Sequence, residues 1–573
     1  MQHETMKKKL GIYICACGGN ISDYVDIEKV KEAIKDEDAV ILAKTTMFAC
    51  GDTNQKDMDA DIKANDLSGV VVASCSPKLH LTTFRNVSER AGLNPYTYVH
   101  ANIREQASWA HSDDKTGATE KAIQIVKAAI AKARLAEALN PITIKSERSV
   151  AVVGAGVAGM KAALSLAGMN DNVYLIEKSK EIGGKLKTMD VISPEKQSGS
   201  DLLKQLEAEI ANNSRIELFT ETILTESSGS IGNFTLKLNT PAGNREVTVG
   251  SVLLATGFDT YTPEEGEFGF LSHSNVITLP EFKAIVQNSS GKHLVVNEKE
   301  INSVAFIYCV GSRQVKGDNK HCSRFCCTAA MQTSLDASDK FSHLQCYHFT
   351  RGTRSYGKQE LIYKATNDKG DIYVQFPDKK PPVVEASGDK LSVKAVDLLL
   401  EKREHEAEVD LVVLVTGMVP DKDETIGNIF KLPKGRDHFF NEIHMKLRPV
   451  ETVIDGVTIA GACQGPKNVA ESVNSAIAAA TKAHSIIAKG ELQLEPIVAY
   501  VDKETCNWCN ACTDACPFSA ISPIDFKGKK VAEISKSTCK GCGMCLPVCP
   551  SDSIELISFT NKEMESMIDV LAQ

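Results

Sequence analysis

The tightest constraint on this 573-residue chain is a pair of cysteine runs near its end. The segments CNWCNACTDACP and CKGCGMCLPVCP share the spacing C-x2-C-x2-C-x3-C followed by proline. Gaps of two residues let three thiolates reach three corners of one iron–sulfur cube, while the fourth, carried past a turn, reaches a neighbouring cube. Zinc held by paired C-x2-C knuckles is the alternative, but the duplicated eight-cysteine pattern with both prolines favours two [4Fe-4S] clusters.

The repeated run predicts an α+β ferredoxin domain over residues 496–573 that binds these two clusters. The crossed pattern assigns the first three cysteines of each run to one cluster, together with the last cysteine of the other run. One cluster is expected on Cys506, Cys509, Cys512 and Cys549, and the other on Cys539, Cys542, Cys545 and Cys516.

The other cysteines are grouped along the chain. Of the 18, four lie in the first 80 residues, four between 309 and 327 and eight in the terminal runs, which leaves only Cys346 and Cys463. A disulfide framework would place its bridges in every domain, yet there is no cysteine between Cys75 and Cys309. The pattern therefore predicts reduced thiols used for metal or redox chemistry.

A dinucleotide-binding signature begins at residue 149 with SVAVVGAGVAGMKAALSLAGMNDNVYLIEKSKEIGGK. An apolar strand leads into Gly154-x-Gly156-x-x-Gly159, a helix follows, and a second strand ends at Glu177. The glycines permit a tight turn, a close approach of the backbone to a pyrophosphate and close helix packing, and Glu177 is expected to bind ribose hydroxyls. A glycine turn that only packs a helix on a sheet is the alternative.

Three downstream features favour an FAD domain in two parts, residues 141–300 and 421–495. They are the pair Gly183-Gly184, the strand end SVLLATGF and the segment TIAGACQGPKNVAESVNSAIAAA. Together with the first signature they resemble the FAD domain of the thioredoxin-reductase and disulfide-reductase flavoproteins. The residues expected to bind FAD are Gly154, Gly156, Val157, Ala158, Gly159, Glu177, Lys178, Gly183, Gly184, Lys185, Thr256, Gly257, Gly461, Ala462 and Gln464.

Those flavoproteins hold an NAD(P)H domain between the two halves, and residues 301–420 are expected to form a degenerate copy of it. NSVAFIYCVGSRQ supplies its opening strand and LVVLVTGMVPD its closing strand, but the glycine-rich phosphate loop is missing. Four thiols stand in its place and favour a third [4Fe-4S] cluster beside the flavin. These are Cys309, Cys322, Cys326 and Cys327. A redox-active Cys326–Cys327 disulfide is the alternative, but it closes a strained ring and leaves the other two cysteines without a role.

The first 140 residues alternate apolar strands with helix-like segments, which predicts a small parallel α/β domain. Cysteines follow the ends of three of these strands, at the edge where open α/β sheets collect their sites. Cys15, Cys17, Cys50 and Cys75 therefore predict a fourth [4Fe-4S] cluster. Ordinary buried thiols are the alternative, because C-x-C is a tight spacing for two ligands. GATEKAIQIVKAAIAKARLAEALN then predicts a long helix that ends at Pro141.

Charge and hydropathy exclude several partners. The chain has 65 Lys+Arg against 74 Asp+Glu and no block of five or six like charges, which argues against nucleic acid. The N-terminus lacks the apolar core of a signal peptide, and no stretch approaches the ~18 apolar residues of a membrane span, so a cytoplasmic location is expected. The basic residues of HFTRGTRSYGKQELIYKA are expected to face solvent, with a partner or the flavin phosphates as the alternative.

The order of these parts resembles the heterodisulfide reductase A subunits, a family of flavin and iron–sulfur proteins in soluble electron-transfer complexes of methanogens and anaerobic bacteria. The resemblance rests on ICACGGNI, VVASCSPKLH, NIREQASWAH, VGAGVAGMKAALSLA, CVGSR, CSRFCC, AGACQGPKNVAESV and the terminal ferredoxin. It implies an oxidoreductase subunit that moves electrons between ferredoxin, or another low-potential carrier, and a disulfide-reducing partner. It also implies that the CVGSR and CSRFCC cysteines are cluster ligands.

The resemblance further implies partner subunits and a form of assembly. The expected partners are heterodisulfide reductase B- and C-like subunits, a hydrogenase or other electron-input subunit, and ferredoxin. The expected assembly is a dimer of such hetero-oligomers. No C-x-x-C lies beside the flavin motifs, so disulfide chemistry is assigned to another chain and no catalytic residue is predicted on this one.

Two departures from the family pattern bear on the mechanism. Members often insert a second ferredoxin module after the glycine pair, whereas GGKLKTMDVISPEKQSGSDLL contains no cysteine. Bifurcating members carry a lysine after the paired cysteines that can approach the flavin, and here TAAMQ places Gln332 at that position. A neutral amide does not stabilise an anionic flavin as a cation does. Bifurcation, plain electron transfer through FAD, and a self-contained NAD(P)H-dependent reductase all stay open, although the missing phosphate loop argues against the last.

Overall fold

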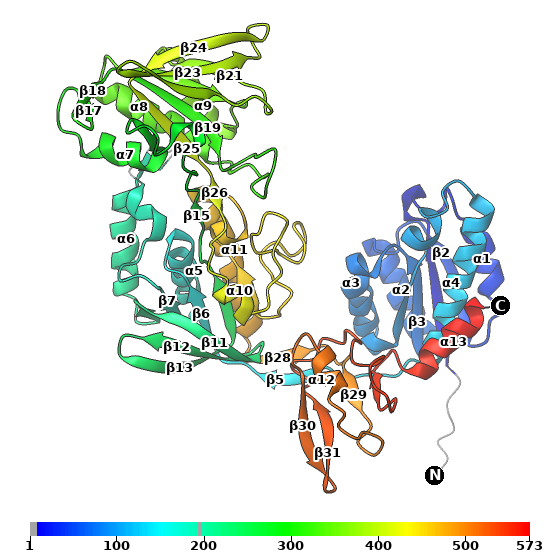
Figure 1. The fold of residues 1–573 in the computed structure, drawn as a ribbon. Coiled ribbons are helices and arrows are strands. Elements are labelled where there is room, and N and C mark those ends of the chain that lie inside the picture. Colours follow the sequence, from blue (N-terminus) through cyan, green and yellow to red (C-terminus); the bar gives the residue numbers. More distant parts are fainter. Residues whose placement is uncertain (1–7, 190, 193–196, 573) are drawn as a thin grey trace. The chain divides into compact units, whose positions relative to one another are not determined.

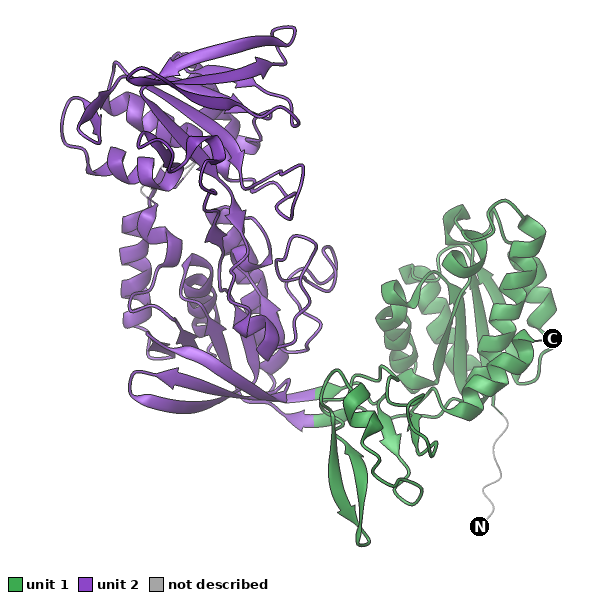
Figure 2. Cartoon of the chain, in the orientation of Figure 1, with its two compact units in different colours: residues 1–143, 493–573 green, residues 144–492 purple. Residues whose placement is uncertain are grey.

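The computed structural model describes residues 8–189, 191–192 and 197–572. The chain divides into two compact units, one made of Met1–Thr143 and Gln493–Gln573 and the other of Ile144–Leu492 (Figure 2). The first unit therefore joins the two ends of the chain. The chain passes between the units in β5 (Ile142–Lys145) and β28 (Glu491–Leu494). The division into five domains predicted from the sequence is finer than these two units and stays a prediction.

The N-terminal part of the first unit is a four-stranded parallel sheet in the order β2-β1-β3-β4. The strands are β1 (Leu10–Cys15), β2 (Val40–Thr46), β3 (Gly69–Ser74) and β4 (Tyr98–Asn102). The helices around it are α1 (Ile27–Ile34), α2 (Asp52–Ala64), α3 (Pro77–Arg90) and α4 (Lys115–Leu135) (Figure 1). The central strands β1 and β3 are buried along their whole length, as expected for a sheet covered on both faces. The predicted parallel α/β domain is confirmed.

Helix α4 ends at Leu135, whereas the sequence predicted a helix that runs to Pro141. The side chain of Asn94 pairs with the backbone of Leu139, since its Nδ2 donates to the carbonyl at 2.8 Å and its Oδ1 accepts the amide at 3.2 Å. Asn140 precedes a proline and is disfavoured in a helix for that reason. The residues before Pro141 are therefore not helical, because the Asn94 side chain forms hydrogen bonds with the backbone amide and carbonyl of Leu139 in place of helical ones.

The C-terminal part of the first unit is built from short antiparallel pairs. Strand β29 (Ala499–Val501) pairs with β32 (Ile554–Leu556), and β30 (Ile521–Phe526) with β31 (Lys529–Ile534). One short helix, α12 (Ala511–Ala515), lies between β29 and β30 in sequence. The last helix, α13 (Asn561–Leu571), packs along α4 (Figure 1) and begins with a capping box formed by Thr560 and Glu563.

The contact between α4 and α13 buries a lysine. Lys132 of α4 is 8% exposed, and its Nζ lies 3.4 Å from the centroid of the Phe559 ring. Burial lowers the pKa of Lys132 to about 8, and the charge of Glu563 opposes this effect. The cation–π contact offsets part of the cost of removing the ammonium group from water.

The second unit contains two parallel sheets. The first has the order β10-β7-β6-β14-β27. Its strands are β6 (Ser149–Val153), β7 (Asn172–Ile176), β10 (Ile216–Phe219), β14 (Ser251–Leu254) and β27 (Val457–Ile459). Helices α5 (Val157–Gly168), α6 (Gly199–Ala211) and α11 (Val469–Ile487) lie on one side of it. The antiparallel strands β11 (Ile223–Ser230), β12 (Asn233–Thr240) and β13 (Gly243–Val249) pack on the other face. Because β27 follows β14 only after the whole second sheet, this domain is formed from two parts of the chain.

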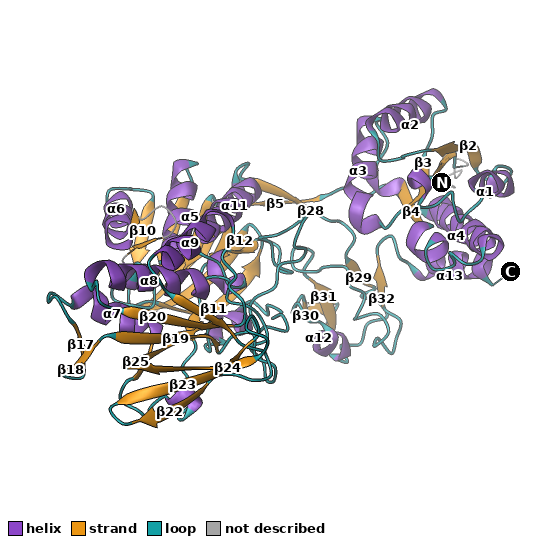
Figure 3. Cartoon of the chain, turned by 90° about the horizontal axis from the view of Figure 1, so that it is seen from above, coloured by secondary structure: helices purple, strands orange, loops and turns teal. Residues whose placement is uncertain are grey.

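The second parallel sheet has the order β16-β25-β19-β20-β21. Its strands β25, β19 and β20 can be followed in Figure 3. Its strands are β16 (Val276–Thr278), β19 (Ser303–Val310), β20 (Gln345–Thr350), β21 (Ile372–Gln375) and β25 (Leu411–Thr416). Helices α7 (Leu279–Asn288), α8 (Cys326–Lys340) and α9 (Glu360–Asp368) accompany it. A sheet of β22 (Val383–Ser387), β23 (Lys390–Asp397) and β24 (Arg403–Val409) packs on its other face. The segments predicted to supply the opening and closing strands form β19 and β25, and these two strands lie side by side.

Short elements complete the second unit. They are the hairpins of β8 (Val191–Ile192) with β9 (Gln197–Ser198) and of β17 (Leu294–Val296) with β18 (Lys299–Ile301), the pair of β15 (Asp259–Thr260) with β26 (Met418–Val419), and helix α10 (Thr425–Ile429). Within the described residues, no helix has the length and apolarity needed to span a bilayer.

We expect Lys132→Met to strengthen the packing of α13 on α4, because an apolar side chain of similar length removes the cost of burying a charge. The pKa of Lys132 is lowered from 10.5 to about 8 in the folded protein. Between these two pH values the unfolded state binds more protons than the folded state, so the stability of the wild type rises with pH in this range. The gain from the substitution should therefore be largest below pH 8 and shrink towards pH 10. Hydrogen exchange of the amides of residues 561–571 measures it.

Lys121→Met, at an exposed position of the same helix, is the matched control and should leave this exchange unchanged. Faster exchange in Lys132→Met than in the wild type would show that the cation–π contact with Phe559 outweighs the cost of burial.

Candidate functional site

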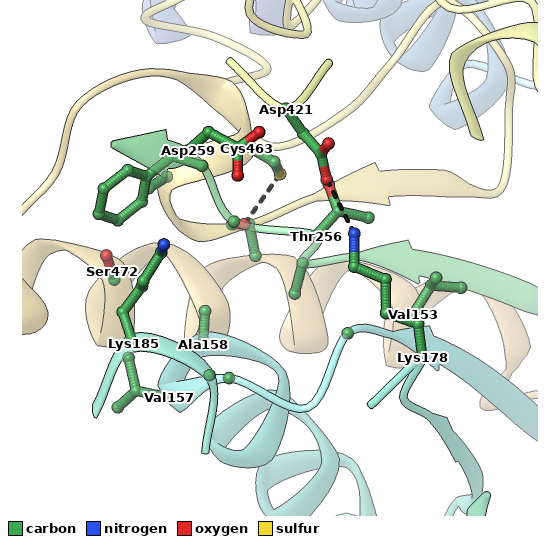
Figure 4. A pocket seen from close by; sticks show the side chains of 18 of the residues that line it. Val153, Val157, Ala158, Lys178, Lys185, Thr256, Asp259, Asp421, Cys463 and Ser472 are labelled. Atoms are coloured by element: carbon green, nitrogen blue, oxygen red, sulfur yellow. Dashed lines mark hydrogen bonds and ion pairs between the residues drawn. The ribbon is translucent and has the colours of Figure 1, made fainter. Parts of the chain in front are cut away.

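A cavity of about 470 Å³ lies in the second unit, at the carboxyl ends of β6, β7 and β14 (Figure 4). Its volume is within the roughly 300–1,000 Å³ of pockets that bind small molecules and cofactors. Phe325 and Met418, from the segments around the second sheet, also line it. The cavity is therefore shared by the two halves of the split domain and by the part of the chain inserted between them.

Most of the residues predicted to bind FAD line this cavity. They are Gly154, Gly156, Val157, Ala158, Glu177, Lys178, Gly184, Lys185, Thr256, Gly257 and Ala462. The other predicted residues lie next to these. Gly183 donates its amide to Ala155 at 2.8 Å, and a Cβ at Gly461 would come 2.8 Å from that of Ala158. Gln464 accepts a hydrogen bond from Lys467, which lines the cavity, at 3.1 Å.

The turn between β6 and α5 shows why glycine occupies three positions. Gly154 has a φ of +101°, and a Cβ there would come 2.4 Å from the carbonyl oxygen of Ala255. A Cβ on Gly159 would come 1.8 Å from the carbonyl oxygen of Gly154, so α5 packs directly on the turn. Nothing lies within 4 Å of the Cβ position at Gly156, which leaves the backbone open to the cavity. The amino end of α5 therefore borders the cavity and can bind an anionic group.

Glu177, directly after β7, fixes the shape of this turn. Its Oε2 accepts the amide of Ala155 at 2.8 Å, and its Oε1 accepts the amide of Ser179 at 2.9 Å. Each carboxylate oxygen keeps a second lone pair, so the same side chain can accept hydrogen bonds from ribose hydroxyls. The acidic residue therefore supports the turn and also lines the cavity.

Five lysines line the cavity: Lys178, Lys185, Lys187, Lys434 and Lys467. Lys178 lies 3.3 Å from Asp421, and Lys185 points toward the cavity (Figure 4). Lys467 donates to the Gly461 carbonyl at 3.3 Å and to Gln464 at 3.1 Å. Burial lowers the pKa of Lys467, and the neighbouring Cys463 opposes this effect. The sequence analysis missed Lys467, although it stands in the quoted segment AGACQGPKNVAESV. Open glycine backbone, a helix amino end and these cations fit a cofactor that carries a diphosphate.

The middle cysteines gather between the end of β19 and the start of α8. Cys309, Cys326 and Cys327 are buried and Cys322 is partly exposed. Burial raises the pKa of Cys309 to about 11, and the other thiols of the group add to this effect. The hydrogen bond between the two vicinal thiols lowers the pKa of Cys327 and raises that of Cys326. The four thiols are therefore close enough to perturb one another's ionisation, as one metal site requires.

Arginines face these thiols. The charges of Arg313 and Arg351 oppose the rise that burial causes in the pKa of Cys309. The charges of Arg313 and Arg354 act together with the hydrogen bond from Cys326 to lower the pKa of Cys327. Arg313 and Arg351 each donate to the other's backbone carbonyl, and the side chain of Arg351 is only 6% exposed. The prediction that the basic residues of HFTRGTRSYGKQELIYKA face solvent is therefore wrong for Arg351, because Arg313 holds this loop over the cysteines.

A buried polar chain supports the strand that carries Cys309. The hydroxyl of Tyr308 lies 2.8 Å from Nδ1 of His348, whose Nε2 lies 2.9 Å from Asp371. Ser334 of α8 donates to the same carboxylate at 2.7 Å. Burial lowers the pKa of His348, and the carboxylate of Asp371 opposes this effect. The chain of hydrogen bonds ties β19, β20 and α8 together behind the cysteines.

The N-terminal cysteines meet at the carboxyl edge of the first sheet, the edge predicted from the sequence. Cys15 ends β1, Cys17 follows it, Cys50 precedes α2, and Cys75 follows β3. Burial raises the pKa of Cys15 to about 11, although its sulfur accepts the amides of Ala49 and Cys17, both at 3.3 Å.

Two side chains support this group from outside it. Arg104 Nη1 lies 3.6 Å from the sulfur of Cys17, a contact that the sequence analysis missed although NIREQASWAH contains this arginine. His100 contacts the carbonyl of Cys75, and burial lowers its pKa to about 4. A neutral imidazole bound to backbone acts as a support for the cysteine loop.

Among the terminal cysteines, Cys516 lies with the cysteines of the other run. Cys516 lines one small cavity with three cysteines of the other run, Cys539, Cys542 and Cys545. The pKa of Cys512 is raised by burial and then by Cys509 and Cys506, which places these three together. Cys549 packs in the same small core, and its sulfur accepts the amide of Ser553 at 3.3 Å. The structure therefore brings Cys516 across to the second run, as the spacing predicted.

The middle cysteines adjoin the cavity through one residue. Phe325 lines the cavity and is followed directly by Cys326 at the start of α8. Its other neighbour, Arg324, forms an ion pair with Glu471 of α11 at 2.5 Å and donates to Tyr356 at 3.2 Å. The cysteine segment is thereby held against the helix that closes the cavity.

Comparison with known proteins identifies the family. Residues 148–297 match the model described as pyridine nucleotide-disulphide oxidoreductase, and residues 499–556 match the 4Fe-4S dicluster domain. The iron–sulfur A subunit, form 2, of the CoB–CoM heterodisulfide reductase of Methanopyrus kandleri is 35% identical over 91% of this chain and 92% of its own length. The chain belongs to the family of heterodisulfide reductase A subunits.

A second relative agrees with this assignment. The A subunit of the H(2):CoB-CoM heterodisulfide,ferredoxin reductase of Methanothermobacter marburgensis is 35% identical over 91% of this chain and 91% of its own length. The solved thioredoxin reductase of T. acidophilum matches 59% of this chain and 99% of its own, at 16% identity and a TM-score of 0.42. The expected fold class is confirmed, and the chain is an oxidoreductase subunit with a flavin domain and a 4Fe-4S domain.

We expect about sixteen irons per chain in protein prepared without oxygen, because sixteen cysteines form four groups of four. Cys516→Ala should remove about four of them, and the loss should fall on the cluster shared with Cys539, Cys542 and Cys545. Iron analysis and low-temperature EPR measure both. Cys346→Ala is the control, since this buried cysteine lies outside the four groups. About eight irons in the wild type would confine the clusters to the terminal runs, and about twelve would fit loss of the N-terminal cluster.

Proposed function

We propose that this chain is the FAD and iron–sulfur electron-transfer subunit of a heterodisulfide reductase-like complex. It would move electrons between ferredoxin, or another low-potential carrier, and a disulfide-reducing partner. The observation that carries the proposal is the position of Phe325, which lines the flavin cavity and is bonded to Cys326. Two relatives are named for ferredoxin and for the CoB-CoM heterodisulfide, which supports this choice of carriers.

FAD is the flavin we assign to the cavity. The turn from Gly154 to Gly159 with the amino end of α5 would hold the diphosphate, and Glu177 the ribose. Lys467, partly buried in the wall, supplies a cation that favours an anionic ligand. Bound there, FAD would exchange electrons in pairs with one partner and singly with iron–sulfur clusters. The chain's own contribution is to orient the cofactor and to place the cysteine segment beside it.

The four groups of cysteines would bind four [4Fe-4S] clusters. The middle group would be the flavin's neighbour, and the terminal ferredoxin clusters would pass electrons on. Arg313, Arg351 and Arg354 would balance the negative charge of the middle cluster. Disulfide chemistry would take place on a partner of the heterodisulfide reductase B or C kind, with a hydrogenase or another protein delivering electrons, in a dimer of such complexes in the cytoplasm.

Plain electron transfer is better supported than bifurcation. Gln332 is buried in α8, where its Nε2 donates to Asp336 at 2.8 Å. An amide held in this way offers no positive charge to a reduced flavin. The proposal therefore contains no bifurcating step.

We expect Cys326→Ala to remove about four irons and to leave FAD bound, because the residues assigned to the phosphates lie between Gly154 and Gly159 and not on this segment. Photoreduction of the flavin should then no longer reduce the terminal clusters, which low-temperature EPR follows. Cys346→Ala, in the same sheet, is the matched control and should behave as the wild type. A Cys326→Ala protein whose terminal clusters are reduced at the wild-type rate would rule out the middle cysteines as the relay.

NADH and NADPH should reduce the flavin of the purified chain only slowly. The strand β19 leads into Cys309 and α8 begins at Cys326, so thiols occupy the place of a phosphate loop. Stopped-flow absorbance measures the bleaching, and photoreduction of the same sample is the control for a competent flavin. Rapid bleaching by either nucleotide would instead support a self-contained NAD(P)H-dependent reductase.

A further inference from the structure

Two histidines and a glutamate converge on the surface of the second unit, in a place that neither the flavin cavity nor the cysteine groups use. Among the described residues, the side chains of His293, Glu300 and His343 bring one ligand atom each to within 4.8 Å of one another. Nδ1 of His293 lies 2.7 Å from Oε1 of Glu300. The rings of His293 and His343 have centroids 5.1 Å apart and planes inclined by 43°.

The hairpin of β17 and β18 sets the first two of these residues on one face. Leu294 pairs with Ile301 and Val295 with Glu300, so His293 and Glu300 are diagonal neighbours on the same side of the hairpin. The opposite side carries Leu294 and Ile301, which are buried in the core below the second sheet. That burial fixes the direction in which the two polar side chains project.

The third residue comes from a separate turn that the same core holds. His343 lies between α8 and β20, and its neighbours Phe341 and Leu344 are both buried in the core that contains Leu294. The amide of Leu344 donates to the carbonyl of Phe341 at 3.0 Å, which closes the turn. Both halves of the cluster therefore stand on one rigid base, as a preorganised site requires.

An ordinary ion pair does not account for the whole cluster. An exposed pair such as His293 with Glu300 contributes little to stability and needs no third partner. Within the described part of the chain, the His343 ring makes no hydrogen bond of its own, yet it lies beside the other imidazole. Two imidazoles next to one carboxylate would repel each other when both are protonated and would share a metal ion when both are neutral.

We propose that His293, Glu300 and His343 bind one zinc ion, with water in the fourth position. Imidazole nitrogen with one carboxylate oxygen is a donor set of zinc sites, whereas calcium and magnesium prefer oxygen alone. Tetrahedral zinc with bonds of about 2.0–2.2 Å separates its ligand atoms by about 3.4 Å. The exposed side chains reach this spacing by small rotations, with the ion replacing the proton shared by His293 and Glu300.

The zinc ion would link the β17–β18 hairpin to the turn that contains His343, and these two segments flank the middle cysteines in sequence. The hairpin leads into β19, which carries Cys309, and the turn of His343 follows α8, which begins with Cys326. The nearby Lys340 already donates to the carbonyl of Val286 at 2.8 Å and holds the end of α8 to α7. The zinc ion would add a second link between segments at this end of α8.

The test uses the whole chain with its clusters intact, prepared without oxygen, so that the cluster-ligating thiols are occupied. Zinc ion itself is the probe, in equilibrium dialysis followed by elemental analysis. We expect one zinc ion per chain and an X-ray absorption spectrum with a first shell of nitrogen and oxygen near 2.0 Å and imidazole scattering beyond it. Glu300→Gln keeps a hydrogen-bond acceptor for His293 and should weaken binding at least about tenfold.

The double variant His293→Ala with His343→Ala should lose the zinc ion, while His111→Ala, an exposed histidine of the first unit, should keep it. Unchanged iron content and flavin absorbance establish that each variant is folded. A sulfur shell near 2.3 Å would assign the zinc to cysteines and overturn the proposal. So would absence of binding to the wild type, or equal affinity in the double variant.

Discussion

The electrostatic balance between buried thiols and arginines is the interaction on which the middle of this protein depends. Removing Cys309, Cys326 and Cys327 from water disfavours their charged forms, yet only thiolates bind iron. Arg313, in the loop after β19, and Arg351, in the loop after β20, oppose that cost, and the guanidinium group of each donates to the backbone carbonyl of the other. The fold thus supplies positive charge before any metal arrives, so that cluster binding and the ordering of these two loops are coupled.

The two α/β domains with cysteines solve the same geometric problem in the same way. In each, a buried parallel strand ends at a cysteine, and a residue there takes a left-handed backbone that non-glycine residues rarely adopt. Cys17 after β1 has a φ of 53°, and Cys309 near the end of β19 has a φ of 63°. Such a turn costs on the order of 1 kcal/mol or more. It redirects the chain at the strand end, so that thiols from separate loops can meet.

Local patterns in the sequence predicted the parts of the site that depend on local geometry. Residue spacing along the chain predicted the Gly154 turn and the strand that leads into Cys309. The spacing of the two terminal runs predicted that Cys516 lies with the cysteines of the second run. Contacts between distant segments were not predictable in this way. Asn94 shortens α4 by pairing with Leu139, and Arg351 turns inward because Arg313 holds its loop. The end of α4 and the direction of Arg351 depend on contacts between segments that are distant in sequence. A pattern within one segment does not show which distant segments it will contact.

The cation that the family pattern places after the paired cysteines is absent here, but positively charged lysines still line the cavity. Gln332 directs its amide to Asp336, whereas Lys467, just before α11, lines the cavity and bonds to Gly461 and Gln464. In a medium of low polarity a single charge acts over a longer distance than in water. Positive charge therefore reaches the cavity from the side of α11 as well as from Lys178 and Lys185, which also line it. A change at Gln332 alone would leave that source of charge in place.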